Sequence, residues 1–315
     1  MVFIQVLTAD LAQIMCAYNL RYLEKIPQEY FCVYKDNPGE VVSCVPQDFC
    51  SNQDALLSYE PNMELEDSYY NWVQKLDLTC ASSAQIGALG SVFFLGWVIT
   101  LTFVPRLSDL YGRARLITWS NIINVVCMVT VLCTTSYYAV LFAHLIQGMT
   151  FTALMQIGCL YIYENCERDM YKRAVALIFF LEGMQGVIVT VYFDYISKQW
   201  MWIFIPFLVL GVIAMLISLT FDESPRYLVK TMQLQRLKSV MAMIANRNGA
   251  DPNLVNPDRI HEMFADLDKN SVMVRDVQAR SETEAMEKVK YSLAEKTGWT
   301  PRLVEETPRT VVKKE

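Results

Sequence analysis

The chain has 315 residues, of which 53% are hydrophobic and 19% charged, and its formal net charge is −6 at pH 7. Soluble globular proteins carry about a quarter charged residues, and here the apolar residues gather in long stretches between polar segments. The composition therefore excludes an ordinary soluble domain and predicts a membrane domain with a polar loop and a polar tail.

Six apolar stretches are long enough to cross a bilayer as helices. A hydrocarbon core about 30 Å thick needs roughly 20 helical residues, because every backbone polar group must be satisfied within the segment. The stretches are residues 1–20, 83–104, 116–136, 138–163, 174–196 and 200–221. The first contains Asp10 and has a signal peptide as its alternative interpretation, but it lacks a basic leading region and a small-residue cleavage site.

We accordingly predict an all-α membrane protein, with a six-span bundle over residues 1–228 and a polar, partly helical tail over 229–315. Helical spacing of apolar residues indicates tail helices at about 230–247 and 282–296. Basic residues gather in the joints between spans two and three and between spans four and five, and in the tail. The positive-inside rule then places the tail on the cytoplasmic side and the loop 21–82 outside.

The outer loop carries an even set of cysteines, which are Cys32, Cys44, Cys50 and Cys80. Such a set in a polar segment on the non-cytoplasmic side indicates two disulfides, with three possible connectivities. Free thiols are the alternative. We expect the plasma membrane or an endomembrane, with the mitochondrial inner membrane as the alternative.

Three ionisable side chains fall inside the predicted spans, and such groups are functional candidates because burying them in a membrane is costly. They are Asp10 in span one, His144 in span four and Glu182 in span five. The carboxylates could line a path for a substrate or ion, and the imidazole could titrate near neutral pH. The alternative is that all three serve as polar contacts between helices.

Three charged motifs lie on the cytoplasmic side. The joint of spans two and three reads PRLSDLYGRARL (105–116), and DESPRYLV (222–229) follows span six. The third is the joint of spans four and five, which holds Glu164 and Arg173. A further motif, NWVQKLDLTC (71–80), precedes span two on the outer side. A glycine turn flanked by a carboxylate and a guanidinium can form ion pairs that hold one conformation.

These motifs resemble the N-terminal six-helix half of the major facilitator superfamily, and most closely its organic cation and sugar transporter branch. The signature loop of that superfamily is G-x-x-x-D-R-x-G-R-R; Asp109, Gly112 and Arg113 match it, whereas Pro105 and Leu110 depart from it. The DESPRYLV segment is similar to the PESPRWL segment of the same branch. The resemblance implies a conformational latch made by Asp109, Gly112, Arg113, Glu164, Arg173, Glu223 and Arg226.

Complete members of the superfamily have twelve spans in two halves around a central site. The resemblance therefore implies half of an alternating-access carrier for a small organic ion or solute, paired with a second six-span half from itself or a separate chain. The alternative is a non-transporting structural or accessory subunit of a larger membrane complex. A chain cut before its second half would restore the ordinary twelve-span transporter.

No enzyme class is indicated. The sequence has no nucleophile elbow, phosphate-binding loop or dinucleotide fingerprint, and its two histidines are far apart. We expect no catalytic residue, no metal and no cofactor. Acidic residues alternate with the lysines of the tail, so we also expect no nucleic-acid partner; the bilayer is the expected environment.

Overall fold

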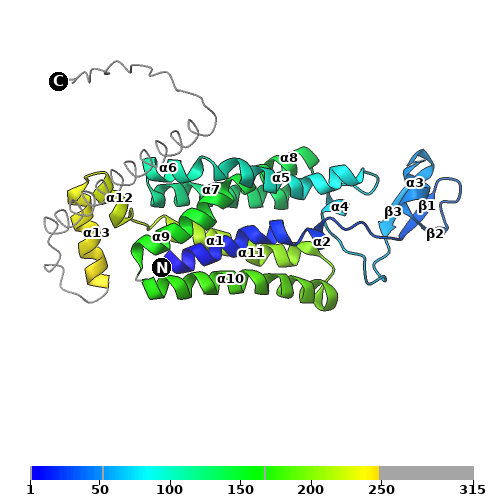
Figure 1. The fold of residues 1–315 in the computed structure, drawn as a ribbon. Helices are drawn as coiled ribbons and strands as arrows, with labels where there is room; N and C mark the ends of the chain where they lie inside the picture. The colour runs from blue at the N-terminus through cyan, green and yellow to red at the C-terminus, as the bar shows by residue number, and fades with distance from the viewer. Residues whose placement is uncertain (1, 52, 167, 248–315) are drawn as a thin grey trace, which may run out of the picture. The chain divides into compact units, whose positions relative to one another are not determined.

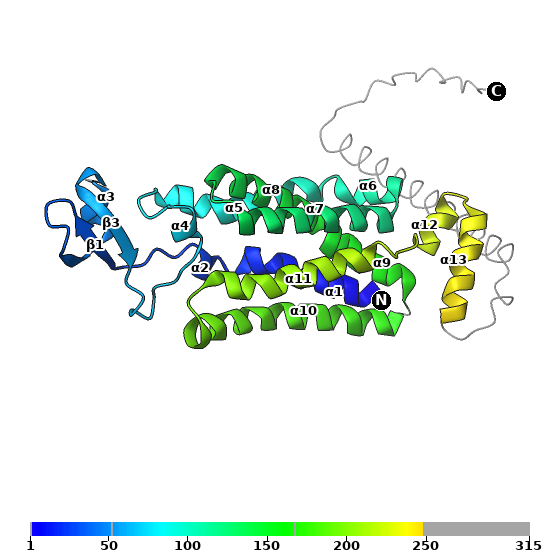
Figure 2. The same ribbon diagram turned by 180° about the vertical axis from the view of Figure 1, so that it is seen from behind.

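The computed structural model describes residues 2–51, 53–166 and 168–247, and this part of the chain is mostly helical (Figures 1 and 2). It holds six helical segments that are long and apolar enough to cross a membrane, in agreement with the six spans predicted from the sequence. The contacts between its residues divide the chain into two compact units, Met1–Ile244 and Ala245–Glu315. The sites described below all lie in the first unit.

The first span combines α1 (Val2–Tyr18) with the short α2 (Leu20–Leu23). The second and third are α5 (Ser83–Leu101) and α7 (Arg113–Cys133). The fourth runs from α8 (Tyr137–Phe151) through a π-helical turn into α9 (Gly158–Asn165). The fifth, α10 (Arg168–Val191), also ends in a π-helical turn, and the sixth is α11 (Trp200–Ser218).

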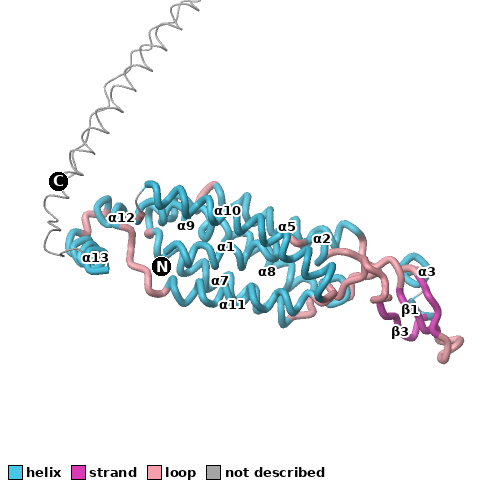
Figure 3. Tube along the Cα trace, turned by 90° about the horizontal axis from the view of Figure 1, so that it is seen from below, coloured by secondary structure: helices cyan, strands magenta, loops and turns pink. Residues whose placement is uncertain are grey.

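The helices pack side by side, and α1 lies against α11, α10 and the fourth span (Figure 3). The contact between α5 and α8 is close because Gly148 lets the two backbones meet. A Cβ atom at Gly148 would lie 1.9 Å from the carbonyl oxygen of Phe93. Between the helices the core combines apolar side chains such as Met15, Met128 and Phe204, which are completely buried, with buried polar side chains that are described below.

The outer loop differs from the all-α prediction because it contains a small antiparallel sheet. Its strands are β1 (Tyr30–Tyr34), β2 (Val41–Cys44) and β3 (Leu56–Pro61), in the order β2-β1-β3. Tyr30 is opposite Cys44 on one side and Pro61 on the other. The run YFCVY of β1 is rich in β-branched and aromatic residues, which favour strands, so this polar loop has its own folded core and the fold is mostly helical instead of all-α.

Two disulfides hold the loop, Cys32 to Cys44 and Cys50 to Cys80. The first joins β1 to β2, and the second joins the end of α3 (Pro46–Cys50) to the segment before α5. Buried aromatic rings fill the space between them, with Tyr30 and Phe49 in edge contact at 5.5 Å. The four loop cysteines thus pair among themselves.

The loop is fixed to the bundle by α4 (Trp72–Lys75) and the residues before it. The Trp72 ring is 1% exposed and lies 4.7 Å from the ring of His144. Lys75 donates to the carbonyl oxygens of Val131 and Leu132 at the end of α7. Tyr70 also forms a parallel bridge with Gln199 in the joint of spans five and six, so the loop contacts spans three and four and this joint.

Short helices lie at the other end of the bundle, away from the sheet (Figure 1). They are α6 (Val104–Tyr111), α12 (Pro225–Lys230) and α13 (Leu234–Arg247). The tail helix predicted at 230–247 corresponds to α13, which starts later because residues 231–233 form a turn. The helix predicted at 282–296 lies outside the described residues, and the domain boundary at 228 stays a prediction.

Candidate functional site

Glu223 caps the N-terminus of α7 from 110 residues away. Its Oε1 accepts hydrogen bonds from the backbone N–H groups of Arg113 at 2.7 Å and Ala114 at 3.1 Å, and from Ser224 at 3.1 Å. The first N–H groups of a helix have no partner within the helix and carry a partial positive charge, so a carboxylate there is stabilising. The segment after span six is thereby attached to the start of span three.

Gly112 makes this cap possible. Its φ of +104° lies in the region that favours glycine, and a Cβ atom there would lie 2.1 Å from Oε2 of Glu223. Any side chain at this position would strain the backbone and push the carboxylate away. The glycine of the sequence motif thus serves both the turn and the close approach of Glu223.

Arg113 pairs with two carboxylates from different elements. Its Nη2 lies 2.7 Å from Oδ1 of Asp109 on α6 and 3.3 Å from Oε1 of Glu164 on α9. The arginine and glutamate side chains are only 8% and 4% exposed, so the ion pair between them is buried. A buried pair of this kind is strongly destabilised when one partner is removed, because the other charge is left uncompensated.

The helix α12 closes the same cluster. The Ser224 hydroxyl donates to Glu164, and the Tyr227 hydroxyl donates to the carbonyl of Leu110 at 3.0 Å. The Arg113 guanidinium lies over the Tyr227 ring at 5.6 Å. We call the group formed by Asp109, Gly112, Arg113, Glu164, Glu223, Ser224 and Tyr227 the inner charge cluster; it joins four elements that are distant in the sequence.

Two of the seven residues predicted for a latch lie elsewhere. Arg173 is exposed on α10, where its Nε donates to the carbonyl of Asp169 within the same helix. Arg226 places its guanidinium over the ring of Tyr163 on α9, at 5.0 Å. Arg173 thus contacts neither Arg113 nor Glu164, while Arg226 reaches α9 through an aromatic contact.

The two carboxylates predicted for a solute path lie near each other between α1 and α10. Asp10 is fully buried, and the charge of Glu182 acts on it. Within the described part of the chain, neither oxygen of Asp10 has a hydrogen-bond partner, and neither does Oε2 of Glu182. Gln185, one turn further along α10, is likewise buried with both amide atoms unpaired among these residues.

His144 belongs to a different set of contacts. Its Nδ1 lies 3.1 Å from Oε1 of Gln147, whose Nε2 donates to Oδ1 of Asn124 at 3.3 Å. Gln13 joins from α1 by donating to the hydroxyl of Thr150 at 2.8 Å. The structure therefore brings Asp10 to Glu182 and places His144 in a hydrogen-bonded contact among α1, α7 and α8, beside Trp72.

Sequence reasoning did not assign Ser224 or Tyr227 to any site, and it considered Gln185 only as a possible polar contact between helices. Ser224 and Tyr227 lie inside the DESPRYLV motif, and their closeness in sequence to Glu223 could have indicated that they belong to the same site. Gln185 lies three residues after Glu182, on the same helical face, and this spacing was also available.

No group of three or more His, Cys, Asp or Glu side chains in residues 2–51, 53–166 and 168–247 is arranged to hold a metal ion.

Comparison with known proteins consistently indicates one class, the transporters. The sugar (and other) transporter family matches residues 41–281. Solute carrier family 22 member 2 of Oryctolagus cuniculus is 25% identical over 208 residues, which are 62% of this chain and 37% of that protein. The organic cation transporter-like protein of Drosophila melanogaster is 27% identical over 217 residues, which are 67% of this chain and 36% of that protein.

The chain thus spans well under two thirds of the length of these relatives. Among solved structures, the inward-open xylose transporter XylE from E. coli is 14% identical to it with a TM-score of 0.46, covering 76% of this chain and 52% of that chain.

Proposed function

The chain belongs to the sugar (and other) transporter family and is an integral, multi-pass membrane protein, and on this premise we propose that it forms half of an alternating-access carrier for a small organic ion or solute. The relatives it matches are transporters and not enzymes. They do not favour the alternative of a non-transporting structural or accessory subunit.

The observation that carries the proposal is the inner charge cluster. Its ion pairs and cap connect α6, α7, α9 and the segment after α11, and such contacts can form in one arrangement of the helices and break in another. A carrier needs an element with two discrete states whose balance the solute can shift. We assign this role to Asp109, Gly112, Arg113, Glu164 and Glu223, with Arg226 contributing through Tyr163.

The unpaired carboxylates support a path for a positively charged solute or coupling ion. Asp10 and Glu182 repel each other when both are ionised, and a cation or proton between them would remove that repulsion. The Drosophila relative is named for organic cations, which fits two carboxyl groups that act on each other electrostatically. His144 is the third candidate, acting through Gln147 instead of through Asp10.

A second six-span half, supplied by another copy or by a separate chain, is the partner that we propose for this carrier. The two disulfides in the loop fit an oxidising compartment on the outer side. We therefore propose the plasma membrane or an endomembrane as its location, with the mitochondrial inner membrane as the alternative.

The test is uptake of radiolabelled tetraethylammonium into proteoliposomes that contain the chain with whatever partner co-purifies in mild detergent. Native mass spectrometry of the same sample identifies that partner. We expect saturable uptake that Glu182→Gln lowers by about tenfold or more. Asp169→Asn, which changes an exposed carboxylate paired only with Lys172, is the matched control and should transport normally.

Two results would count against the proposal. One is a sample in a large multi-subunit particle with no saturable uptake, which would make the chain an accessory subunit. The other is uptake that Glu182→Gln and Asp10→Asn leave unchanged, which would remove these carboxylates from the path.

A further inference from the structure

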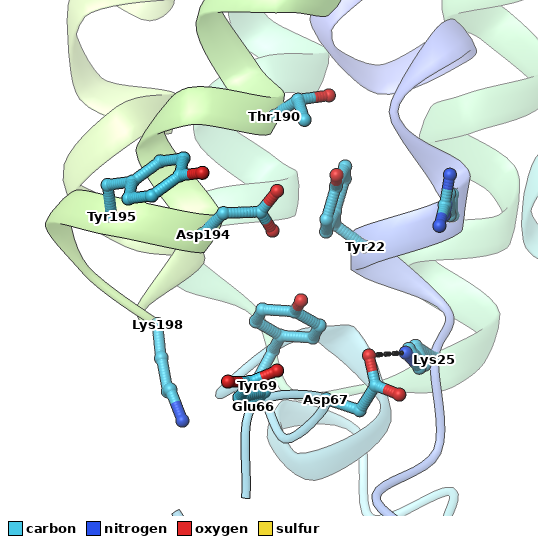
Figure 4. A pocket seen from close by; sticks show the side chains of 10 residues that line it. Tyr22, Lys25, Glu66, Asp67, Tyr69, Thr190, Asp194, Tyr195 and Lys198 are labelled. Atoms are coloured by element: carbon cyan, nitrogen blue, oxygen red, sulfur yellow. Dashed lines mark hydrogen bonds and ion pairs between the residues drawn. The ribbon is translucent and has the colours of Figure 1, made fainter.

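A cavity of about 550 Å³ lies at the outer end of the bundle, where α2, the loop before α4 and the end of the fifth span meet (Figure 4). Its walls include Arg21, Tyr22, Tyr69, Thr190, Asp194 and Tyr195. Sites for small molecules typically have volumes of about 300–1,000 Å³. This cavity is therefore large enough for a compact organic solute, and it is separate from the pair Asp10 and Glu182.

The aromatic part of the wall is held in place by packing. Tyr22 stacks on Phe193 with ring centres 4.8 Å apart, and Tyr69 meets both rings edge-on at 5.5 and 5.3 Å. The backbone of Tyr70 bonds to Lys198 and Trp200, which fixes the loop against the joint of spans five and six. The tyrosine rings are thus in position before any ligand arrives.

Two of the basic side chains at the cavity are already engaged. Lys25 pairs with Asp67 at 2.5 Å, and Lys198 donates to the carbonyl oxygens of Met63 and Leu65. In Figure 4 the Lys198 side chain points away from the centre, whereas the Asp194 carboxylate points toward Tyr22 and Tyr69.

Other charges at the cavity remain available to a ligand. Within the described residues Asp194, Glu66 and Arg21 have no ion-pair partner, and all three side chains are exposed. Arg21 lies over the Tyr22 ring at 5.9 Å. Burial raises the pKa of the Tyr69 hydroxyl, Asp194 raises it further and Arg21 opposes the rise, so both charges act on this side chain.

We propose that this outer cavity binds a small zwitterion, with its ammonium group held by Asp194 and the tyrosine rings and its carboxylate held by Arg21. A cation placed over tyrosine faces is stabilised by the negative face of the ring, and a guanidinium binds a carboxylate through charge-assisted hydrogen bonds. A simple cation would leave Arg21 facing a like charge, and a simple anion would lie against Asp194 and Glu66. A zwitterion gives Arg21 a carboxylate partner and places its ammonium group in a cavity whose unpaired side chains include two carboxylates, Asp194 and Glu66.

The test is equilibrium binding of radiolabelled glycine betaine to the purified full chain in nanodiscs, which does not depend on transport. We expect saturable binding, and we expect Asp194→Asn and Arg21→Gln each to weaken it by about tenfold or more, since each removes one charge-assisted contact. Lys172→Gln at the inner end is the control and should bind as the unchanged chain does. Tetramethylammonium and acetate, which each carry one of the two charges, should compete about tenfold less well than unlabelled betaine.

The proposal is overturned if betaine shows no saturable binding, or if both neutral variants bind it normally. Equal competition by tetramethylammonium, together with no effect of Arg21→Gln, would make this a plain cation site and would also overturn it. If a neutral variant fails to give a monodisperse sample, Asp194→Glu and Arg21→Lys replace it, because they keep the charge and move it by one or more bonds. These two should still weaken betaine binding, and normal binding by both would count against the assignment.

Discussion

Buried ionisable side chains have polar partners at the inner end of the bundle, whereas Asp10 in its middle has none among the described residues. In the inner charge cluster Arg113 contacts two carboxylates, and Glu223 accepts three backbone N–H groups. Between α1 and α10, Asp10 is completely buried, and its oxygens have no hydrogen-bond partner among the described residues. A buried charge with partners fixes one arrangement of the elements around it, whereas a buried charge without partners costs stability and is a candidate for function.

The largest effect that this comparison predicts is for Arg113→Ala. Removing the guanidinium leaves Glu164, which is 4% exposed, without its cation. Loss of one partner from a buried pair costs about 3–5 kcal/mol, so thermal unfolding in detergent should shift to markedly lower temperature. Lys172→Ala, which breaks an exposed ion pair, should cost about 0.5 kcal/mol or less. Equal melting of the two variants would remove the structural role of Arg113.

Gly112→Ala tests the cap of α7 and should have the next largest effect. The added Cβ would meet Glu223 at 2.1 Å in a backbone conformation that alanine avoids, which should lower the free energy of unfolding by about 2 kcal/mol. Gly183→Ala is the matched control, since it lies within α10 and a Cβ there would meet nothing within 4 Å. Replacing a glycine in the middle of a helix should stabilise by about 0.5–1 kcal/mol. The two alanines should therefore change stability in opposite directions.

The parts of the molecule that the sequence predicted correctly are those that depend on local pattern. Hydropathy and length identify a span whatever its neighbours are, and all six spans are present. The motifs that hold Gly112 and Glu223 were also identified from their residues, but the cap that joins them over 110 residues of sequence is seen only in the structure.

Features that depend on how helices are rotated against one another could not be read in this way. Hydropathy does not say which face of α8 meets α1, so the sequence left His144 with two interpretations, a path shared with Asp10 and Glu182 or a polar contact with a neighbour such as Gln147; the structure shows the contact with Gln147. Cysteine pairing and the sheet of the outer loop need the three-dimensional path of the chain, since four cysteines allow three connectivities. Likewise, Arg173 was assigned to a latch from its position in a joint, whereas its side chain bonds within α10.

Asp10→Asn should act in the opposite direction from Arg113→Ala. The substitution replaces a buried carboxyl group that has no hydrogen-bond partner in the described chain by a neutral amide of the same shape. We expect a gain of about 1 kcal/mol in the free energy of unfolding, because a carboxyl group without partners loses more favourable hydration on burial than an amide does. Asp169→Asn, at an exposed position, should change the free energy of unfolding by less than Asp10→Asn does. A clear loss of stability in Asp10→Asn would mean that this carboxylate has a stabilising partner and that the contrast drawn above is wrong.

Glu24 lies between these two extremes and should give the smallest effect, a dependence of stability on pH. Its Oε1 accepts one hydrogen bond from the N–H of Gly90 at 2.9 Å. Burial raises the pKa of the Glu24 carboxyl from 4.5 to about 7, although the Gly90 hydrogen bond opposes the rise. A raised acid pKa means that the folded state favours the protonated form. The contribution of Glu24 to stability is therefore full below pH 4.5 and is lost as the pH rises through about 7.

Because Glu24 is partly solvated, screening limits this loss to about 1 kcal/mol or less. Melting temperatures measured between pH 4.5 and 8 should fall more steeply for the unchanged chain than for Glu24→Gln, which cannot ionise, while Glu64→Gln at an exposed loop position should follow the unchanged chain. If Glu24→Gln keeps the full slope, the single N–H donor of Gly90 is enough to keep the carboxylate charged. The boundary between partnered and unpartnered carboxylates would then lie between Glu24, with one donor, and Asp10, with none in the described chain.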